Sequence, residues 1–184
     1  MSGNSTRAAV GVANGTGAAA IAGALIASFV GGVIVGSLVG AWAGRRRRRS
    51  VIGFVSTLLA AAAGAHVVGL PVMVSALLMA AAMSAENAVF ERAGDVGIGL
   101  TYMTGTLVKT GQRLTAALRG GDRWGWLPFL LLWLGLVAGA VLGALSYRAL
   151  GLHALWIATA WAAVLALLAG RYAPYSPQSS PISP

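Results

Sequence analysis

The sequence predicts an all-α protein, a polytopic transmembrane helical bundle built from two inverted repeats, with short interfacial or re-entrant helices. Three observations lead to this fold class: the apolar composition, a series of apolar segments long enough to cross a bilayer, and a motif that occurs twice. Of the 184 residues, 58% are hydrophobic and 9% are charged, and the mean hydropathy is +0.80. Such a chain has too little polar surface to close a soluble globule, so we expect an integral membrane protein in contact with the lipid bilayer.

Apolar segments of about 20 residues are needed to cross a hydrocarbon core of about 30 Å. Such segments lie at residues 18–43, 50–68, 71–91, 124–147 and 152–170. Two further stretches, 2–14 and 101–118, mix polar and apolar residues, and we expect short helices there that lie at the interface or enter the membrane only partly. The Pro/Ser-rich stretch 173–184 cannot bury enough apolar surface to order itself and is expected to be a disordered tail.

A motif of methionine, a hydroxyl residue and glycine occurs at Met1-Ser2-Gly3-Asn4 and again at Met103-Thr104-Gly105-Thr106. Each copy is followed by a long apolar segment with glycine at every fourth residue. These glycines are Gly32, Gly36, Gly40 and Gly44 in the first segment and Gly135, Gly139 and Gly143 in the second. Because internal repeats of apolar segments are typical of transporter folds, we expect a first repeat at 1–70 and a second at 71–172.

Basic residues set the expected orientation, because short loops rich in arginine and lysine stay in the cytoplasm. The run Arg45–Arg49 then lies inside, and so do the basic residues from Lys109 to Arg123 if 101–118 does not cross. On that count the two glycine-rich segments run in opposite directions, which makes the repeat inverted. The C-terminal tail is then cytoplasmic.

The second repeat has a leading apolar segment before its motif, whereas nothing precedes Met1 in this sequence. The repeat therefore predicts a further span upstream, with Met1 as an internal methionine. A real divergence between the two halves is the alternative.

Three strings carry a resemblance to a known family: Met1-Ser2-Gly3-Asn4, Glu86-Asn87-Ala88, and Thr-Tyr-Met-Thr-Gly-Thr-Leu at 101–107. They resemble the YoaK-like family of bacterial inner-membrane proteins, over nearly the whole chain from Met1 to about Gly170. The resemblance implies about six spans, a helix ahead of the first motif and a multi-pass location in the cell inner membrane. It implies no activity, because none is assigned to that family.

Glu86 is the one acidic residue inside an expected span. An ionisable side chain at membrane depth is costly and tends to mark a transport path or proton relay. The alternative is that Glu86, near the cytoplasmic end of its helix, reaches the interface or bonds to a neighbouring helix. Asn87 fits either interpretation, because a buried amide must be paired.

The two repeated motifs place small polar groups at the starts of short helices, where free N–H groups attract anions or polar parts of a solute. We therefore expect both motifs to meet at one polar substrate site, with Glu86 and Asn87 lining or supporting it. The motif residues of this site are Ser2, Gly3, Asn4, Thr104, Gly105 and Thr106. The alternative is that these residues are helix caps.

The glycine stripes are expected to serve helix packing, because small residues at every fourth position let two helices approach closely. We expect segments 18–43 and 124–147 to pack on one another or on another subunit, which makes a homo-oligomer possible. Replacing Gly36 or Gly139 with leucine is expected to force the helices apart.

Several classes of function are disfavoured by what the sequence lacks. The basic residues that give the net charge of +9 lie between apolar segments, where they indicate the orientation of the chain in the membrane and not nucleic-acid binding. The chain has no cysteine, and two histidines, His66 and His153, cannot make a zinc site alone. No catalytic set, metal-ligand spacing or phosphate-binding loop occurs, so we expect neither an enzyme nor a cofactor. A transporter of a small solute or ion is the expectation, and a membrane scaffold or interaction protein is the alternative.

Cysteine labelling tests the expected topology. Positions 45–49 and 109–123 should be protected from reagents added outside the cell, and the turn at Gly69-Leu70 should be labelled by them. Outside labelling of position 119 would contradict the inverted repeat and favour a parallel one.

Overall fold

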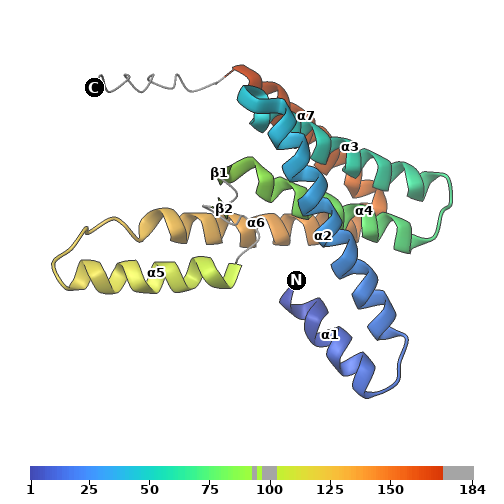
Figure 1. Ribbon diagram of the computed structural model, residues 1–184, viewed down its shortest axis with the longest axis horizontal. Coiled ribbons are helices and arrows are strands. Elements are labelled where there is room, and N and C mark those ends of the chain that lie inside the picture. The colour runs from blue at the N-terminus through green and yellow to red at the C-terminus, as the bar shows by residue number, and fades with distance from the viewer. Residues whose placement is uncertain (93–94, 97–102, 172–184) are drawn as a thin grey trace, which may run out of the picture.

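The computed structural model describes residues 1–92, 95–96 and 103–171, which form seven α-helices joined by short connections (Figure 1). The helices are α1 (Ser2–Ala13), α2 (Ala18–Ala43), α3 (Arg47–Val67), α4 (Val72–Ala85), α5 (Met103–Leu118), α6 (Leu127–Leu150) and α7 (Leu155–Arg171). Three 3-10 helices are η1 (Gly44–Arg46), η2 (Glu86–Phe90) and η3 (Gly151–Ala154), and β1 (Glu91–Arg92) pairs antiparallel with β2 (Asp95–Val96). The tail expected at 173–184 lies outside the described residues.

The all-α prediction is confirmed, because each segment expected to be helical overlaps one of these helices, although α3, α6 and α7 each extend past one predicted end. The expected span 71–91 differs in one respect: its α-helix stops at Ala85 and continues as the 3-10 helix η2. The buried amide of Asn87 donates to the backbone oxygens of Ser84, at 3.1 Å, and Met83, at 3.4 Å. These bonds satisfy carbonyls that a helix end leaves without partners, so the α-helix can end before the apolar segment does.

In the described part of the chain, three continuous helical stretches are long and apolar enough to cross a membrane: Ala18–Val67, Val72–Val89 and Leu127–Gly170. The first and third each contain a reversal, so they comprise α2 with α3 and α6 with α7 (Figure 1). The reversals occur at Gly44 and Gly151, whose φ angles are +51° and +57°. This left-handed conformation is easy for glycine and strained for other residues.

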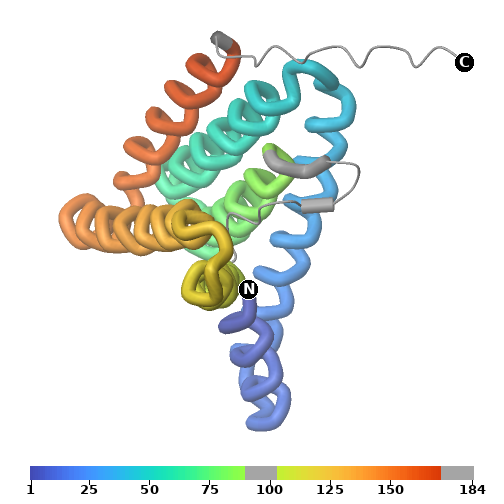
Figure 2. The backbone as a smooth tube through the Cα atoms, turned by 90° about the vertical axis from the view of Figure 1, so that its left-hand side faces the viewer, coloured from blue at the N-terminus to red at the C-terminus, as the bar shows by residue number. Residues whose placement is uncertain are grey.

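Helices α2, α3, α4 and α7 form a packed bundle in which α4 contacts both α2 and α3, and α7 lies along α3. Helix α1 folds back along the first half of α2, while α5 and α6 form a hairpin that extends away from the bundle (Figures 1 and 2). Among the described residues, α6 has no buried side chain and connects to the bundle mainly through η3.

Serine hydroxyls connect neighbouring helices of the bundle through backbone carbonyls. Ser28 of α2 donates to Leu77 O of α4 at 2.6 Å, and Ser75 of α4 donates to Ala62 O of α3 at 2.8 Å. Ser56 of α3 donates to Thr159 O of α7 at 3.1 Å. Such bonds are a common device for joining helices in lipid, where no water competes for the carbonyl. They fix the order α2, α4, α3, α7 across the bundle.

The glycine stripe of α2 packs against α4 and not against α6. A Cβ atom on Gly32 would overlap Ser84 and Ala81 of α4, and one on Gly36 would lie 2.8 Å from the Cα of Ala85. At Gly40 it would lie 2.9 Å from the Nε atom of Arg47. The first stripe is therefore a close helix contact, as expected, but its partner differs from the expected one.

The stripe of α6 has open space around it in this structure. A Cβ atom added at Gly135, Gly139 or Gly143 would meet no heavy atom within 4 Å. The expected packing of 18–43 on 124–147 is thus not the arrangement of the described chain. A glycine spacing defines a face that can accept a close neighbour, but it does not say which helix that neighbour is. The boundary between repeats at residue 70 stays a prediction, and α4, assigned to the second repeat, packs with α2 and α3 of the first.

The two stripes give a matched pair of substitutions. Gly36→Leu should destabilise the protein by about 1–3 kcal/mol, because the leucine must displace the backbone of α4. Gly139→Leu should leave the stability nearly unchanged, because nothing lies against that face. Thermal melting in detergent measures both. An equal loss of stability in the Gly139 variant would contradict the open position of α6.

Candidate functional site

The start of α1 is placed at the middle of α2 by a tight turn between the two helices. Gly15 in this turn has a φ of +62°, and a Cβ atom on Gly11 of α1 would lie 2.5 Å from the backbone nitrogen of Ala19 of α2. Because α1 spans about 18 Å at 1.5 Å per residue, its first turn reaches far along α2. The first turn of α1 lies beside Phe29, which is near the middle of α2, at position 12 of its 26 residues.

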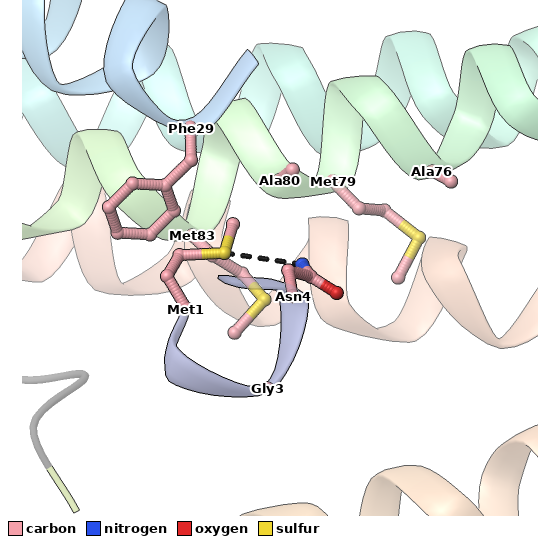
Figure 3. A pocket seen from close by; sticks show the side chains of 8 residues that line it. All are labelled: Met1, Gly3, Asn4, Phe29, Ala76, Met79, Ala80 and Met83. Carbon is pink, nitrogen blue, oxygen red and sulfur yellow. Dashed lines mark hydrogen bonds between the residues drawn. The ribbon is translucent and has the colours of Figure 1, made fainter. Parts of the chain in front are cut away.

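A pocket of about 450 Å³ opens at this point (Figure 3). Its lining comes from three helices: Met1, Gly3 and Asn4 at the start of α1, Phe29 of α2, and Ala76, Met79, Ala80 and Met83 of α4. The four α4 residues recur at the spacing of a single helix face. The volume falls in the range of pockets that hold small molecules, and the walls are largely apolar.

Asn4 brings a polar side chain to this apolar pocket. Its amide Nδ2 donates to the Met1 sulfur at 3.3 Å (Figure 3), and in the described part of the chain it makes no other side-chain hydrogen bond. A thioether is a weak acceptor, so the amide can exchange it for a stronger one. The first N–H groups of α1 also lie at this end, where a helix has no partners of its own for them and carries a partial positive charge.

The helix-cap interpretation receives no support at the first motif. No described side chain caps α1, and the Asn4 amide bonds to a sulfur and not to a backbone group. Ser2 is exposed and is absent from the pocket lining, and its carbonyl accepts a bond from the Thr6 hydroxyl at 3.2 Å. Met1, Gly3 and Asn4 are thus the pocket residues of the first motif, and of the three predicted site residues Ser2 is the one that does not line it.

The second motif begins α5, and the first turn of α5 lies close to the start of α1 in both views (Figures 1 and 2). Thr104 and Gly105 are exposed, whereas Thr106 is buried and its carbonyl accepts a bond from the Thr110 hydroxyl at 2.9 Å. None of these residues is among those that line the pocket. The structure therefore brings the two motif-bearing ends near each other, with one of them in the pocket.

Glu86 and Asn87 lie one helical turn beyond the pocket residue Met83, in η2. Glu86 is half-buried and Asn87 is buried, and neither lines the pocket. Their 3-10 helix packs against α2 and α3, and there Arg47 Nε donates to Ala88 O at 2.8 Å. Asn87 therefore shapes the end of α4 through the bonds that stop the α-helix, and Glu86 lies beside it in η2.

Sequence reasoning missed the apolar walls of the pocket and the position of Arg47. Phe29, Met79 and Met83 resemble any other apolar residue of a span until the fold places them around a cavity. The sequence predicts an orientation signal at Arg47 and no packing role, whereas its side chain is half-buried beside Gly40. The glycine at position 40 was the available signal, because a missing side chain next to an arginine-rich turn leaves room for one of the arginines.

Comparison with known proteins gives a family and a membrane location but no activity. Residues 1–168 match the model of a family described as protein of unknown function, DUF1275. The chain is 38% identical over 113 residues to the UPF0700 transmembrane protein RA0705 of Rhizobium meliloti (strain 1021), which is 61% of this chain. The match spans about half, 49%, of that relative. No solved structure matches the chain.

The YoaK-like naming and the upstream helix stay predictions, while the membrane character expected from composition agrees with both the transmembrane relative and the three apolar helical stretches. A family match over residues 1–168 covers nearly the whole described chain. The protein is therefore a membrane protein that belongs to the DUF1275 family of proteins of unknown function.

Proposed function

We propose that this protein transports a small solute and binds it in the pocket at the start of α1. The observation that carries the proposal is the position of the short helix α1. Its N-terminal turn lies beside the middle of α2 and forms one wall of a pocket. Transporter folds use short or interrupted helices in this way, because their ends bring unpaired backbone groups to the middle of the membrane.

The solute class follows from the groups in the pocket. The α1 N–H groups and the Asn4 amide donate hydrogen bonds, and the positive end of a helix favours an anionic or strongly polar acceptor. Phe29, Met79 and Met83 offer an apolar surface to the remainder of the molecule. A small carboxylate with an apolar side fits this combination.

The order of elements supports a duplicated unit. A short helix, a long helix, a 3-10 turn and another helix occur as α1, α2, η1, α3 and again as α5, α6, η3, α7. A glycine with positive φ follows each short helix, at Gly15 and Gly120, and each long one, at Gly44 and Gly151. We infer that α5 supplies the second half of the site when the α5–α6 hairpin moves against the bundle, as repeats do in transporters.

The orientation proposed is cytoplasmic for the arginine-rich turn and for the end of α7, in the cell inner membrane. Arg49 lies against the last turn of α7, since a Cβ atom on Gly170 would be 3.0 Å from its Cδ atom. The end of α7 therefore lies on the same side as the arginines, which short-loop charge places in the cytoplasm.

A membrane scaffold is the second candidate, and the uncovered glycine stripe of α6 favours it. Such a stripe suits a close contact with a helix of another protein or subunit. A scaffold has no need of the α1 pocket, so substitutions in the pocket distinguish the two functions.

The binding prediction uses two asparagines at opposite ends of α1. Asn4→Leu removes the amide from the pocket and should abolish both uptake into proteoliposomes and ligand-induced stabilisation with a panel of small carboxylates and amino acids. Asn14→Leu makes the same chemical change at the exposed end of α1 and should leave both intact. The melting temperature without ligand should stay nearly the same in the Asn4 variant.

A structural role for Asn4 would give the opposite result. The variant would then lose about 0.5–2 kcal/mol of stability, as a lost cap does, while still binding and transporting when folded. That outcome, or a panel that stabilises neither the wild type nor the control, would contradict the transport proposal.

Cross-linking tests whether the second motif belongs to the same site. The chain has no cysteine of its own, so Gly3→Cys with Gly105→Cys gives a clean pair, and a short bifunctional thiol reagent should join them. Gly3→Cys with Thr115→Cys, near the far end of α5, is the matched control and should stay unlinked. Equal yields in both pairs would contradict a shared site.

A substitution in the second motif tests the same point by binding. Thr104→Val should abolish solute binding while the melting temperature stays nearly unchanged, because it removes a hydrogen-bonding hydroxyl from the proposed site.

A further inference from the structure

The two histidines of the chain meet in the structure although they lie far apart in the sequence. His66 is in the last turn of α3, and His153 is in η3, at the turn between α6 and α7. Their rings approach edge to face, with centroids 5.3 Å apart and an angle of 65° between the ring planes. No sequence motif pairs them, because each is surrounded by apolar or small residues.

Packed core residues hold both histidines in place. Ala62 and Ala63 of α3 are buried against Leu155 at the start of α7, and Leu152 of η3 packs on the same cluster. Ser75 of α4 fixes this turn of α3 by donating to Ala62 O at 2.8 Å. His66 follows one helical turn after the cluster, and His153 lies in η3 between the cluster residues Leu152 and Leu155, so the fold fixes the backbone positions from which the two rings approach each other.

The pair is not enclosed by the rest of the described chain. His66 is half-buried and His153 is exposed, and the neighbouring Val67 and Val68 are exposed as well. The pair lies at the end of α3 opposite Arg47, about 30 Å away at 1.5 Å per residue over the 21 residues of the helix. It therefore lies at the end of the expected span away from the arginine-rich turn, which the expected topology places at the membrane surface.

We propose that His66 and His153, which cannot form a closed zinc site alone, bind together with water one divalent transition-metal ion of the class that imidazole prefers: Zn²⁺, Ni²⁺ or Cu²⁺. A metal–nitrogen bond of about 2.1 Å places an ion about 3.2 Å from each ring centroid, and a tetrahedral angle between two such ligands separates the centroids by about 5.2 Å. The observed separation is 5.3 Å. Because His153 is exposed, its ring is free to turn about the Cβ–Cγ bond and present a nitrogen to the ion.

Water completes the coordination, because the described residues contain no group of three or more His, Cys, Asp or Glu side chains that could hold a metal. The site is thus a two-ligand clamp and not a closed structural site, which needs four protein ligands. Its effect would be local. An ion bound here ties the end of α3 to η3, which is also the connection between the bundle and the α5–α6 hairpin.

The test uses the full chain in detergent with a purification tag that contains no histidine. Titration calorimetry with ZnCl₂, NiCl₂ and CuCl₂ should show one ion per chain for at least one metal, and that metal should raise the melting temperature. His66→Gln and His153→Gln should each weaken the apparent affinity about tenfold or more, since each removes one of two ligands.

His153→Phe separates metal binding from ring packing. Phenylalanine keeps an aromatic edge against His66 but has no nitrogen, so this variant should melt like the wild type without metal and lose the metal-induced rise. The proposal is overturned if the His66→Gln/His153→Gln double variant binds the metals as the wild type does, or if none of the three ions binds the wild type. A metal response retained by His153→Phe would overturn it as well.

Discussion

The close approach of α2 and α4 is the contact on which the rest of the structure depends. Glycine on α2 faces alanine and serine on α4, so the two backbones touch at Gly36 and Ala85. In lipid, where burial of apolar surface gives no advantage over contact with acyl chains, such complementarity of small residues is what holds helices together. The contact places one face of α4 opposite Phe29, and that face is the wall of the pocket. It also brings η2 over α2 and α3, where Arg47 bonds to Ala88.

The sequence predicted the helices well because their signals are local. Apolar length and the mixed character of the short stretches depend only on residues next to each other in the chain, and α1, α2 and α5 begin and end close to the expected positions. The partner of the α2 stripe could not be predicted in the same way. Alanine and glycine occur throughout the apolar segments, so Ala81, Ser84 and Ala85 do not stand out as the complement of Gly32 and Gly36 until the helices are in place.

The candidate site was predictable only in its polar part. The repeated motif pointed to Gly3 and Asn4, and both line the pocket. The apolar walls come from α2 and α4, and the motif holds no information about them. Glu86 attracted attention as an acid within a span, but its helix changes type there and it lies beyond the pocket. An ionisable residue in a span must be accommodated by the surrounding structure. The sequence does not show whether a binding site or a helix end accommodates it.

Arg47 links two properties of a membrane protein that are usually separate. The Nε, Cζ and Cγ atoms of this residue lie in the space left by Gly40, and Nε donates to the carbonyl of Ala88, so a member of the arginine-rich run is also part of the helix packing. The basic residues that set the orientation of a membrane protein can commonly replace one another, because any lysine or arginine near the end of a span has the same effect. Here the arginine at position 47 also makes specific contacts with Gly40 and Ala88. If the run sets the orientation as proposed, a change at position 47 alters both the charge that directs insertion and the contacts with Gly40 and Ala88, whereas a change at an exposed arginine of the run alters the charge alone.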